Sequence, residues 1–258
     1  MTRIDSRRRR RFLARTLGAT GALLLAGCNK LSQTEWFPQV LGTGEKASAA
    51  LAHLLTSRTS MAQEFTEADR SPQFRSNGTA NPNSPEYRAL AAGGFAAYRL
   101  AIGGLVEQPA SFSLAELRAL PARTQITRHD CVEGWSAIAK WKGARLSALL
   151  NAVRPKPEAR YAVFYCADPM AADGTDLYYE SIDMEDAYHP QTILAYEMND
   201  AVLPVANGAP IRLRVERQLG YKHAKYVMRI ELVDSFDRIA GGNGGYWEDN
   251  GYQWFAGI

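Results

Sequence analysis

Runs of β-branched and aromatic residues, separated by short helical patterns, restrict the fold of this chain more than any other feature. Five runs are typical of strands: YRLAIGGLV (98–106), YAVFYCAD (161–168), TILAYEM (192–198), IRLRVER (211–217) and KYVMRIELVD (225–234). A capping-box pattern at Ser113 and Glu116 predicts a helix over 113–120, and another short helix is expected over 145–153. Strands and helices do not alternate as in a βαβ chain. The sequence therefore predicts an α+β fold built on mixed, mostly antiparallel sheet.

The first 28 residues have the layout of an export signal, with a basic start, a short apolar middle and small residues before Cys28. The apolar run is shorter than the ~20 residues that cross a membrane as a helix. RRRFL (9–13) resembles the twin-arginine motif, which directs the export of folded proteins, and LAGC (25–28) resembles a lipobox. We therefore predict a periplasmic protein, exported folded and anchored by a lipid on Cys28. The alternatives are an ordinary peptidase site or a plain basic leader.

Charge and cysteine spacing exclude several classes of function. The whole chain has a net charge of +3, but residues 1–28 hold seven arginines and one acid, so the remainder is net negative. A nucleic-acid binder should keep a basic excess after its leader is removed, which argues against that class. The sequence has no CxxC, CxxCH or Cys/His zinc spacing, so zinc clusters and covalently attached haem are unsupported.

The rest of the chain is expected to form a tether and one domain. Residues 29–64 are alanine-rich and polar, with a helix expected near 47–57. Residues 70–90 are rich in proline, asparagine and glycine, which predicts a long ordered loop. Residues 65–258 have a length that suits a single large domain.

Cys131 stands alone in RHDCVEGWSAIAKWKG (128–143), a region that is otherwise charged, apolar or aromatic. From the residues alone it is half of a disulfide, a buried filler, a nucleophile or a metal ligand. In an oxidising compartment it could pair with Cys166, the other thiol left after the leader.

A second informative stretch surrounds Gly220, between two of the β-rich runs. Arg212, Lys222 and Lys225 could converge around this turn, where backbone N–H groups are also exposed. Cations and backbone donors at a glycine turn suit a phosphate group. A solvated basic hairpin is the alternative.

Three motifs become specific through their joint order: CVEGWS (131–136), LAYEMNDAVLPVANGAPIRL (194–213) and GYKHAKYVMRIEL (220–232). With them the chain, from about Phe65 to its C-terminus, resembles the molybdenum-cofactor domain of the sulfite oxidase superfamily. It resembles the exported bacterial branch that includes the periplasmic methionine-sulfoxide reductase catalytic subunit. The resemblance implies the sulfite oxidase-type molybdopterin-binding fold and a Mo-molybdopterin cofactor.

The resemblance also implies roles for individual residues. Cys131 would supply the one protein thiolate on molybdenum, where soft sulfur ligands are suitable and a coordinated thiol is deprotonated. Cys166 would contact the cofactor without being a second metal ligand. The other residues that match cofactor-binding positions line the pterin or close around its phosphate: Phe74, Arg75, Ser76, Asn77, Gly78, Asn207, Arg212, His223, Ala224 and Lys225.

The implied reaction is two-electron oxygen-atom transfer by a molybdopterin-dependent oxidoreductase. Tyr252 in YWEDNGYQWFAGI (246–258) matches a tyrosine that would donate a hydrogen bond to the oxo ligand or substrate; a satisfied core tyrosine is the alternative. Sulfite oxidases carry an arginine where this chain has Ser76, with Arg75 one residue earlier. We therefore expect a sulfoxide or another small S- or N-oxide as the substrate. A sulfite oxidase-like dehydrogenase and a non-catalytic cofactor-binding module are the alternatives.

Electrons are expected to pass to or from a separate protein, either a cytochrome or a membrane haem subunit, because the resemblance covers no haem domain. Tyr178, Tyr179, Glu180 and His189 either edge the mouth of the site or belong to a capped helix with surface acids. His129 either tunes the site by a hydrogen bond or is an ordinary buried histidine.

Overall fold

The computed structural model describes residues 34, 36, 43, 44, 47, 51, 57, 59–171 and 173–258. The predicted leader with Cys28, and most of the predicted helix near 47–57, lie outside these residues. Thr56–Ile258 form a compact unit, which begins before the predicted boundary at residue 65. Residues just before that boundary are bonded to the domain, since the Gln191 side chain exchanges two hydrogen bonds with the backbone of Ala62, at 2.7 and 3.0 Å.

The first sheet has five strands. Their order is β2 (Ala110–Ser113), β1 (Arg99–Gly104), β10 (Val227–Val233), β5 (Tyr161–Pro169) and β6 (Leu177–Asp183). β1 and β10 run parallel, and the other three neighbouring pairs are antiparallel. One parallel pair in an otherwise antiparallel sheet requires a long connection between its strands, which here contains most of the domain.

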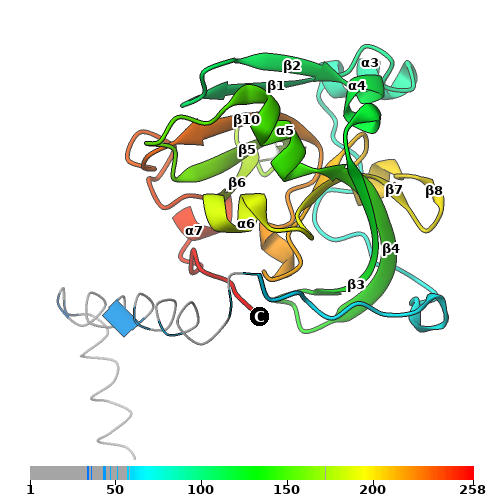
Figure 1. Ribbon diagram of the computed structural model, residues 1–258, viewed down its shortest axis with the longest axis horizontal. Helices are drawn as coiled ribbons and strands as arrows, with labels where there is room; N and C mark the ends of the chain where they lie inside the picture. The colour runs from blue at the N-terminus through cyan, green and yellow to red at the C-terminus, as the bar shows by residue number, and fades with distance from the viewer. Residues whose placement is uncertain are drawn as a thin grey trace, which may run out of the picture. The chain divides into compact units, whose positions relative to one another are not determined.

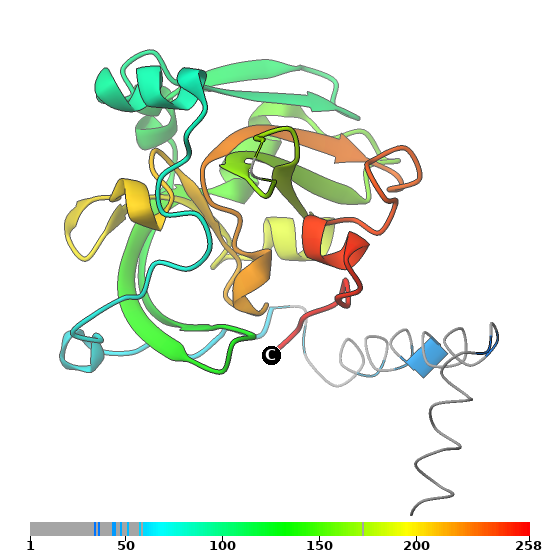
Figure 2. The same ribbon diagram turned by 180° about the vertical axis from the view of Figure 1, so that it is seen from behind.

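The second sheet is antiparallel throughout its described pairs. Its order is β3 (Ala122–Asp130), β4 (Ser136–Arg145), β7 (Ile193–Met198) and β8 (Ala201–Val202), and β9 (Arg212–Arg214) also pairs with β7. Figures 1 and 2 show the long β3–β4 hairpin curving along one side of the domain and the first sheet on the other side. The α+β prediction, with mixed and mostly antiparallel sheet, is confirmed.

The helices are short and connect the strands. They are α3 (Pro85–Ala92), α4 (Leu114–Ala119), α5 (Leu146–Val153), α6 (Met184–Tyr188) and α7 (Tyr246–Asp249), with single 3₁₀ turns η1 (Glu67–Asp69), η2 (Val205–Asn207) and η3 (Gly220–Lys222). The predicted capping box is present at α4. Ser113 Oγ accepts a hydrogen bond from Glu116 N at 3.2 Å, and the Glu116 carboxylate accepts one from Ser113 N at 2.7 Å. None of the helices in the described ranges has the length and apolar character needed to cross a bilayer.

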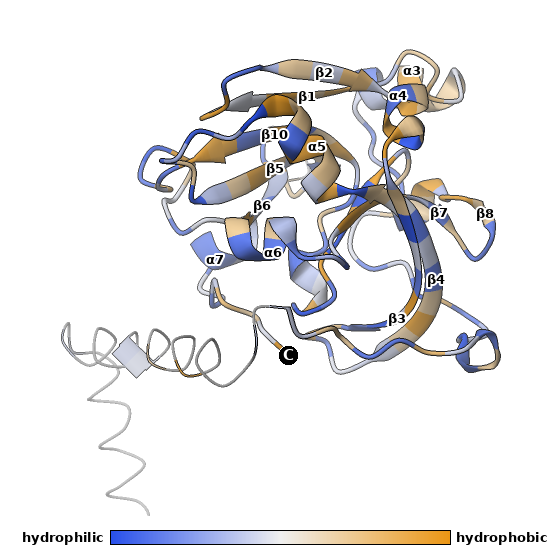
Figure 3. Ribbon diagram, in the orientation of Figure 1, coloured by the Kyte–Doolittle hydropathy of each residue, from blue (hydrophilic) through white to orange (hydrophobic). Residues whose placement is uncertain are grey.

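The main core lies where α5 packs between the two sheets. Leu146, Leu149, Leu150 and Val153 recur at helical spacing and are fully buried. They join a cluster that includes β10 and β5 residues on one side and Ala144 and Leu194 on the other. Figure 3 shows apolar residues along β10, β5 and α5, and alternating polar and apolar residues along β4. Burial of one face of each sheet against α5 therefore fixes the strand ends that carry the site.

We predict that Leu149→Ala lowers the free energy of unfolding by about 2–5 kcal/mol, because it leaves a cavity among fully buried side chains. Leu177→Ala is the matched control, since that leucine is 45% exposed, and it should change stability by less than about 1 kcal/mol. Urea unfolding of both variants checks this. Equal losses for the two would contradict the placement of the core.

Candidate cofactor-binding site

A deep pocket of about 380 Å³ opens between the two sheets. Its size lies within the roughly 300–1,000 Å³ of small-molecule sites. Its wall comes from chain segments that are far apart in sequence: the loop at 74–79, the β3–β4 turn, the end of β5, the 206–225 segment and the C-terminal turn. The residues of the predicted site that line it are Phe74, Arg75, Ser76, Asn77, Gly78, Cys131, Asn207, Arg212, His223, Lys225 and Tyr252.

Two residues of the predicted site are placed behind the wall. Cys166 on β5 and Ala224 are buried, 3% and 1% exposed, and belong to the main core cluster. Ala224 stands between the wall residues His223 and Lys225, and Cys166 is two residues before the wall residue Asp168. The roles of all these residues toward a cofactor stay predictions.

Cys131 lies at the tight turn that joins β3 to β4. The turn is closed by bonds from Cys131 N to Trp135 O and from Gly134 N to Cys131 O, at 2.9 and 3.0 Å, and Gly134 takes the positive φ of +82° that it needs. The Asn77 amide donates to Cys131 Sγ at 3.2 Å. The sulfur is thus aimed into the pocket by two segments, with one hydrogen bond already directed at it.

The thiol chemistry of Cys131 is that of a buried, unpaired cysteine. Among the described residues Cys131 and Cys166 are free thiols, so the disulfide considered from sequence is not formed. Burial raises the pKa of the Cys131 thiol, and Arg75 opposes this shift. A bound metal cation reverses such a shift and deprotonates a coordinated thiol outright.

Two cations, the buried Arg212 and the half-buried Lys225, also line the pocket. Arg212 on β9 donates to Asn207 O at 3.0 Å and to His223 O at 3.4 Å, and its guanidinium lies 5.0 Å from the Trp141 ring centroid. Lys225 Nζ donates to Asn77 O and Thr79 O, both at 2.5 Å. Burial, with a smaller contribution from Arg214, lowers the pKa of Arg212 to about 9, and burial together with Arg212 lowers that of Lys225 to about 8. An anion in this pocket would relieve both effects.

Lys222 does not join these cations, contrary to the sequence prediction that all three converge. Its ammonium is buried, 1% exposed, and is bound by the carboxylates of Glu180 and Glu248 at 2.5 and 2.6 Å. The short 3₁₀ turn η3 places Lys222 and Lys225 on different sides of the segment. The turn residue Gly220 does line the pocket, where an added Cβ would lie 2.6 Å from His129 Nε2.

Asp168, near the end of β5, is a wall residue whose carboxyl group interacts with the charges of Lys225 and Arg212. It is 5% exposed, and burial raises its pKa to about 7, while Lys225 and Arg212 oppose the shift. No sequence motif singled it out, although a lone acid at the end of the buried run YAVFYCAD is a usable signal. Tyr221 and Trp247 also line the pocket, and only the folding back of the C-terminal segment brings them together.

Unpartnered polar atoms test whether this wall suits a ligand. Within the described part of the chain, four wall residues each have a buried polar atom without a hydrogen-bond partner: Asp168 Oδ1, Asn207 Nδ2, Arg212 Nε and His223 Nδ1. Folded proteins rarely leave such atoms unpaired. They supply both donors and acceptors around a pocket that also holds a thiol and two cations. That set fits an anionic ligand with many heteroatoms and a metal centre.

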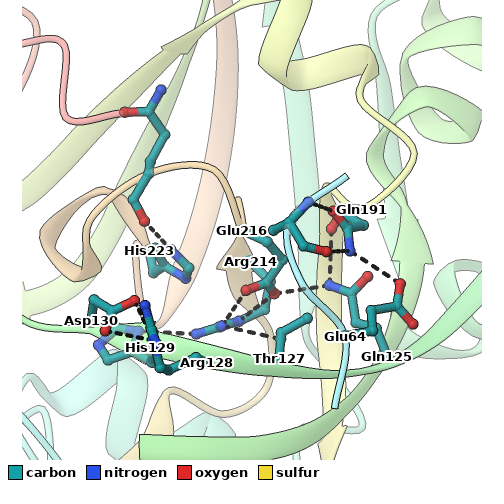
Figure 4. Close-up of polar contacts among 12 residues, drawn as sticks. Glu64, Gln125, Thr127, Arg128, His129, Asp130, Gln191, Arg214, Glu216 and His223 are labelled. Carbon is teal, nitrogen blue, oxygen red and sulfur yellow. Dashed lines mark hydrogen bonds and ion pairs between the residues drawn. The ribbon is translucent and has the colours of Figure 1, made fainter. Parts of the chain in front are cut away.

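His129 and Arg214 form the support behind the Cys131 turn (Figure 4). His129 Nδ1 is 3.0 Å from Arg214 Nη1, and Arg214 also binds Glu216 at 2.5 and 2.8 Å, all within the buried interior. Burial and Arg214 lower the pKa of His129 well below its ordinary value. His129 is therefore a neutral, hydrogen-bonded wall residue.

Aromatic side chains surround the mouth of the pocket. Tyr252 is 41% exposed, so it is not the core tyrosine that sequence left as an alternative. Its ring stacks on Trp247 at 5.2 Å and meets the edge of Tyr221 at 5.3 Å between centroids. On the other side, the exposed Arg75 guanidinium lies 5.9 Å from the Trp135 ring centroid.

Arg75 and Ser76 both line the pocket, so the one-residue shift does not remove the guanidinium from the mouth. This segment is a loop, so the alternation of side chains along an extended strand does not apply to it. Ser76 Oγ donates to Ala206 O at 2.5 Å, which ties the loop to the 206–225 segment.

The sequence left two alternatives for residues 178–189, the mouth of the site or a capped helix, and each holds for part of this stretch. Tyr178 lines the pocket, whereas Tyr179 bonds to Asp249 and His189 bonds to Ser60 O at 3.0 Å. The predicted capped helix is α6, whose N-cap Asp183 accepts from Asp186 N at 2.8 Å. Glu180 precedes this helix and is fully buried.

We predict a pH signature for Asp168 in the chain without its ligand. Because its folded pKa is about 7, above the ordinary 3.8, this group takes stability away as pH rises from about 4 to about 7. Asp168→Asn removes that loss. Between about pH 4 and pH 7, the free energy of unfolding of the variant should therefore rise relative to that of the wild type by up to about 1.4 kcal/mol per pH unit. Urea unfolding at several pH values measures the difference. A difference that does not change with pH would contradict the buried, protonated state.

Comparison with known proteins adds a family and several relatives. The model of a family described as "Oxidoreductase molybdopterin binding domain" matches residues 90–238. A putative protein-methionine-sulfoxide reductase subunit YedZ1 of Azospira oryzae is 37% identical over 249 residues, which is 96% of this chain and 87% of that protein. The methionine-sulfoxide reductase catalytic subunit MsrP of Xanthomonas axonopodis pv. citri is 29% identical and covers 90% of this chain and 72% of its own length.

A solved structure, the sulfane dehydrogenase SoxCD from Paracoccus pantotrophus, aligns with a TM-score of 0.49 and 25% identity. The alignment covers 58% of this chain and 45% of that one.

Proposed function

Since this chain belongs to the family of oxidoreductases with a molybdopterin-binding domain, and is thus a molybdopterin-dependent enzyme of the sulfite oxidase type, we propose that it reduces a sulfoxide. The reaction would be two-electron oxygen-atom transfer. The observation that supports this most is the pocket that joins a free thiol, two cations and four unpartnered polar atoms. The relatives named as methionine-sulfoxide reductases support a sulfoxide as the oxygen donor.

The wall residues fit Mo-molybdopterin by the chemistry of their groups. Cys131 would hold the metal, because a thiolate is a soft ligand and the site has a sulfur aimed at its centre. Arg212 and Lys225 would bind the phosphate, since both line the pocket and both have lowered pKa values that an anion would restore. Asp168, Asn207 and His223 would bond the pterin ring through their unpartnered atoms. Bound molybdenum supplies the two-electron exchange of an oxygen atom.

The chain's own residues would bind and orient the substrate at the mouth. Trp247 and Tyr252 line the opening, and sulfur groups make favourable contacts with aromatic rings. The Tyr252 hydroxyl would donate a hydrogen bond to the sulfoxide oxygen or to the oxo group. Its stacking on Trp247 would hold that hydroxyl in place.

One observation favours a second candidate function. Arg75 keeps a guanidinium at the mouth, over Trp135, where it could attract an anion such as sulfite. Oxidation of sulfite, with electrons passed to a cytochrome, is therefore the alternative reaction. A non-catalytic module is disfavoured, because family membership assigns oxidoreductase activity and the chain keeps Cys131, Arg212 and Lys225 in one pocket.

We propose a periplasmic location and a separate electron-transfer partner for the enzyme. The twin-arginine-like leader supports export after the cofactor is inserted, and LAGC supports a lipid anchor at Cys28. Both relatives above are named as subunits, which supports a second protein, a cytochrome or a membrane haem subunit. Mass spectrometry of the mature N-terminus tests lipidation.

We predict that Lys225→Ala lowers the molybdenum content of the purified protein. A hydrogen bond to a charged group contributes about 1.5–3 kcal/mol, so affinity for the phosphate should fall roughly 10- to 100-fold. Cys131→Ala should remove the metal, and Lys156→Ala, at an exposed lysine, should leave about one molybdenum per chain. Metal analysis measures all three. Unchanged molybdenum in Lys225→Ala would contradict the assignment.

We predict that the wild-type holoenzyme reduces methionine sulfoxide with an artificial electron donor, and oxidises sulfite weakly or not at all. The test is a turnover screen across sulfite, methionine sulfoxide and other S- and N-oxides. Fast sulfite oxidation with cytochrome c, without sulfoxide reduction, would replace the proposed reaction by the alternative.

A further inference from the structure

A buried group of three charged side chains lies beside the pocket and is not used by the reaction described so far. Lys222 Nζ from η3 contacts Glu180 Oε1 on β6 at 2.5 Å and Glu248 Oε1 on α7 at 2.6 Å. All three residues are at most 4% exposed. One ammonium therefore faces two carboxyl groups in the interior.

The surroundings add no further positive charge to this group among the described contacts. The rings of Trp254 and Tyr221 cover the ammonium, with centroids 5.1 and 5.8 Å from Nζ. The other titratable neighbours are Tyr178 and Tyr179 on β6, Cys166 on β5, and the acids Asp168 and Asp249, and none of these carries a positive charge. Two ionised carboxylates would leave an uncompensated buried negative charge, which is costly.

One of the two carboxyl groups is therefore expected to hold a proton. Burial raises the pKa of Glu180 well above its ordinary value, and Glu248 adds to the shift while Lys222 opposes it. The geometry acts in the same direction, since a single ammonium faces both carboxyl groups in the interior. Pairs of carboxyl groups that share a site commonly keep one proton between them. The charges then balance, with one ammonium, one carboxylate and one carboxylic acid.

Tyr178 connects this group to the pocket. Its side chain is part of the pocket wall, and its hydroxyl oxygen lies 3.2 Å from Glu180 Oε2. The same hydroxyl donates to Tyr221 O at 2.5 Å, which leaves its oxygen able to accept from a protonated Glu180. At the other end of the group, Glu248 Oε2 has no hydrogen-bond partner within the described residues. A continuous line of polar atoms thus runs from α7 to the pocket.

We propose that Glu180, Lys222 and Glu248 form a proton store that feeds the pocket through Tyr178 during sulfoxide reduction. This inference rests on the proposed function, because reducing a sulfoxide to a thioether and water consumes two electrons and two protons. The electrons come from the external haem protein or an artificial donor. The Tyr178 hydroxyl turns from Tyr221 toward the pocket and gives its proton to the sulfoxide oxygen, while Glu180 passes its own proton to the phenol oxygen. The S–O bond breaks as the two electrons arrive, and the oxygen leaves as water once it has received a second proton.

The step leaves Glu180 as a carboxylate beside the Lys222 ammonium. Solvent protons return through Glu248, whose helix α7 belongs to the C-terminal turn. The store supplies one proton in each passage, so two passages complete the reaction. Lys222 stabilises the charge left on Glu180, which keeps the buried group from holding its proton too tightly.

The first test is spectroscopic and needs no turnover. Infrared spectra of the holoenzyme, labelled with ¹³C only in its glutamate carboxyl groups, should show a protonated glutamate at pH 7. Glu180→Gln and Glu248→Gln should each remove that signal, because the remaining carboxylate pairs with Lys222. The label excludes Asp168, whose pKa is also raised. A wild type with every glutamate ionised at pH 7 would overturn the store.

The second test follows re-oxidation of pre-reduced holoenzyme, with molybdenum content matched between variants. Tyr178→Phe and Glu180→Gln should slow re-oxidation by methionine sulfoxide at least roughly 10-fold, as expected for loss of a positioned proton donor. The solvent deuterium isotope effect should change in these variants, and the KM for the sulfoxide should not. Tyr165→Phe, on β5 outside the pocket wall, should match the wild type.

A comparison of acceptors separates a protonic role from a structural one. Re-oxidation by ferricyanide takes electrons without a sulfoxide oxygen to protonate, so Tyr178→Phe and Glu180→Gln should keep the wild-type rate with it. Equal losses with both acceptors, or wild-type rates with the sulfoxide, would overturn the inference. A wild type that reduces no sulfoxide would instead refute the proposed function, and the infrared test would still decide whether the store exists.

Discussion

The buried guanidinium of Arg214 is the interaction on which the geometry of the pocket depends. It joins Glu216, His129 and Thr127 in the interior, and so ties β9 to β3 (Figure 4). Cys131 directly follows β3, and Arg212 is two residues before Arg214. The distance between the thiol and the cationic wall is therefore set by this one group. Because removing a partner from a buried ion pair leaves an uncompensated charge, the arrangement has little freedom to shift.

Charge is distributed unequally on the two sides of this frame. In the pocket, Arg212 and Lys225 repel each other, and their lowered pKa values indicate a site that lacks negative charge. Behind the pocket, Lys222 is bound by two carboxyl groups, so acidic groups outnumber the single ammonium there. The first side suits an anionic cofactor, and the second suits storage of a proton. Both follow from the same short segment, since η3 turns Lys222 away from Lys225.

The mouth of the pocket is built differently from its interior. Tyr252, Trp247 and Tyr221 are held by ring contacts on the C-terminal segment, which returns to the domain through bonds such as Leu219 N to Ala256 O at 2.8 Å. Aromatic surfaces of this kind bind apolar groups of a substrate while the buried wall binds the cofactor. The exposed Arg75 keeps the mouth attractive to anions as well, which is why the substrate needs an experiment.

The sequence by itself determined the strand pattern, the α4 capping box and the identity of most pocket residues, because these depend on periodicity and on motifs that are contiguous along the chain. It also led to the family, through three motifs in a fixed order. Only the tertiary structure decided which side chains meet. Asp168 and Tyr178 enter the site, Cys166 withdraws into the core, and Lys222 faces Glu180 and Glu248, because burial and the turn at η3 act between segments that are distant in sequence.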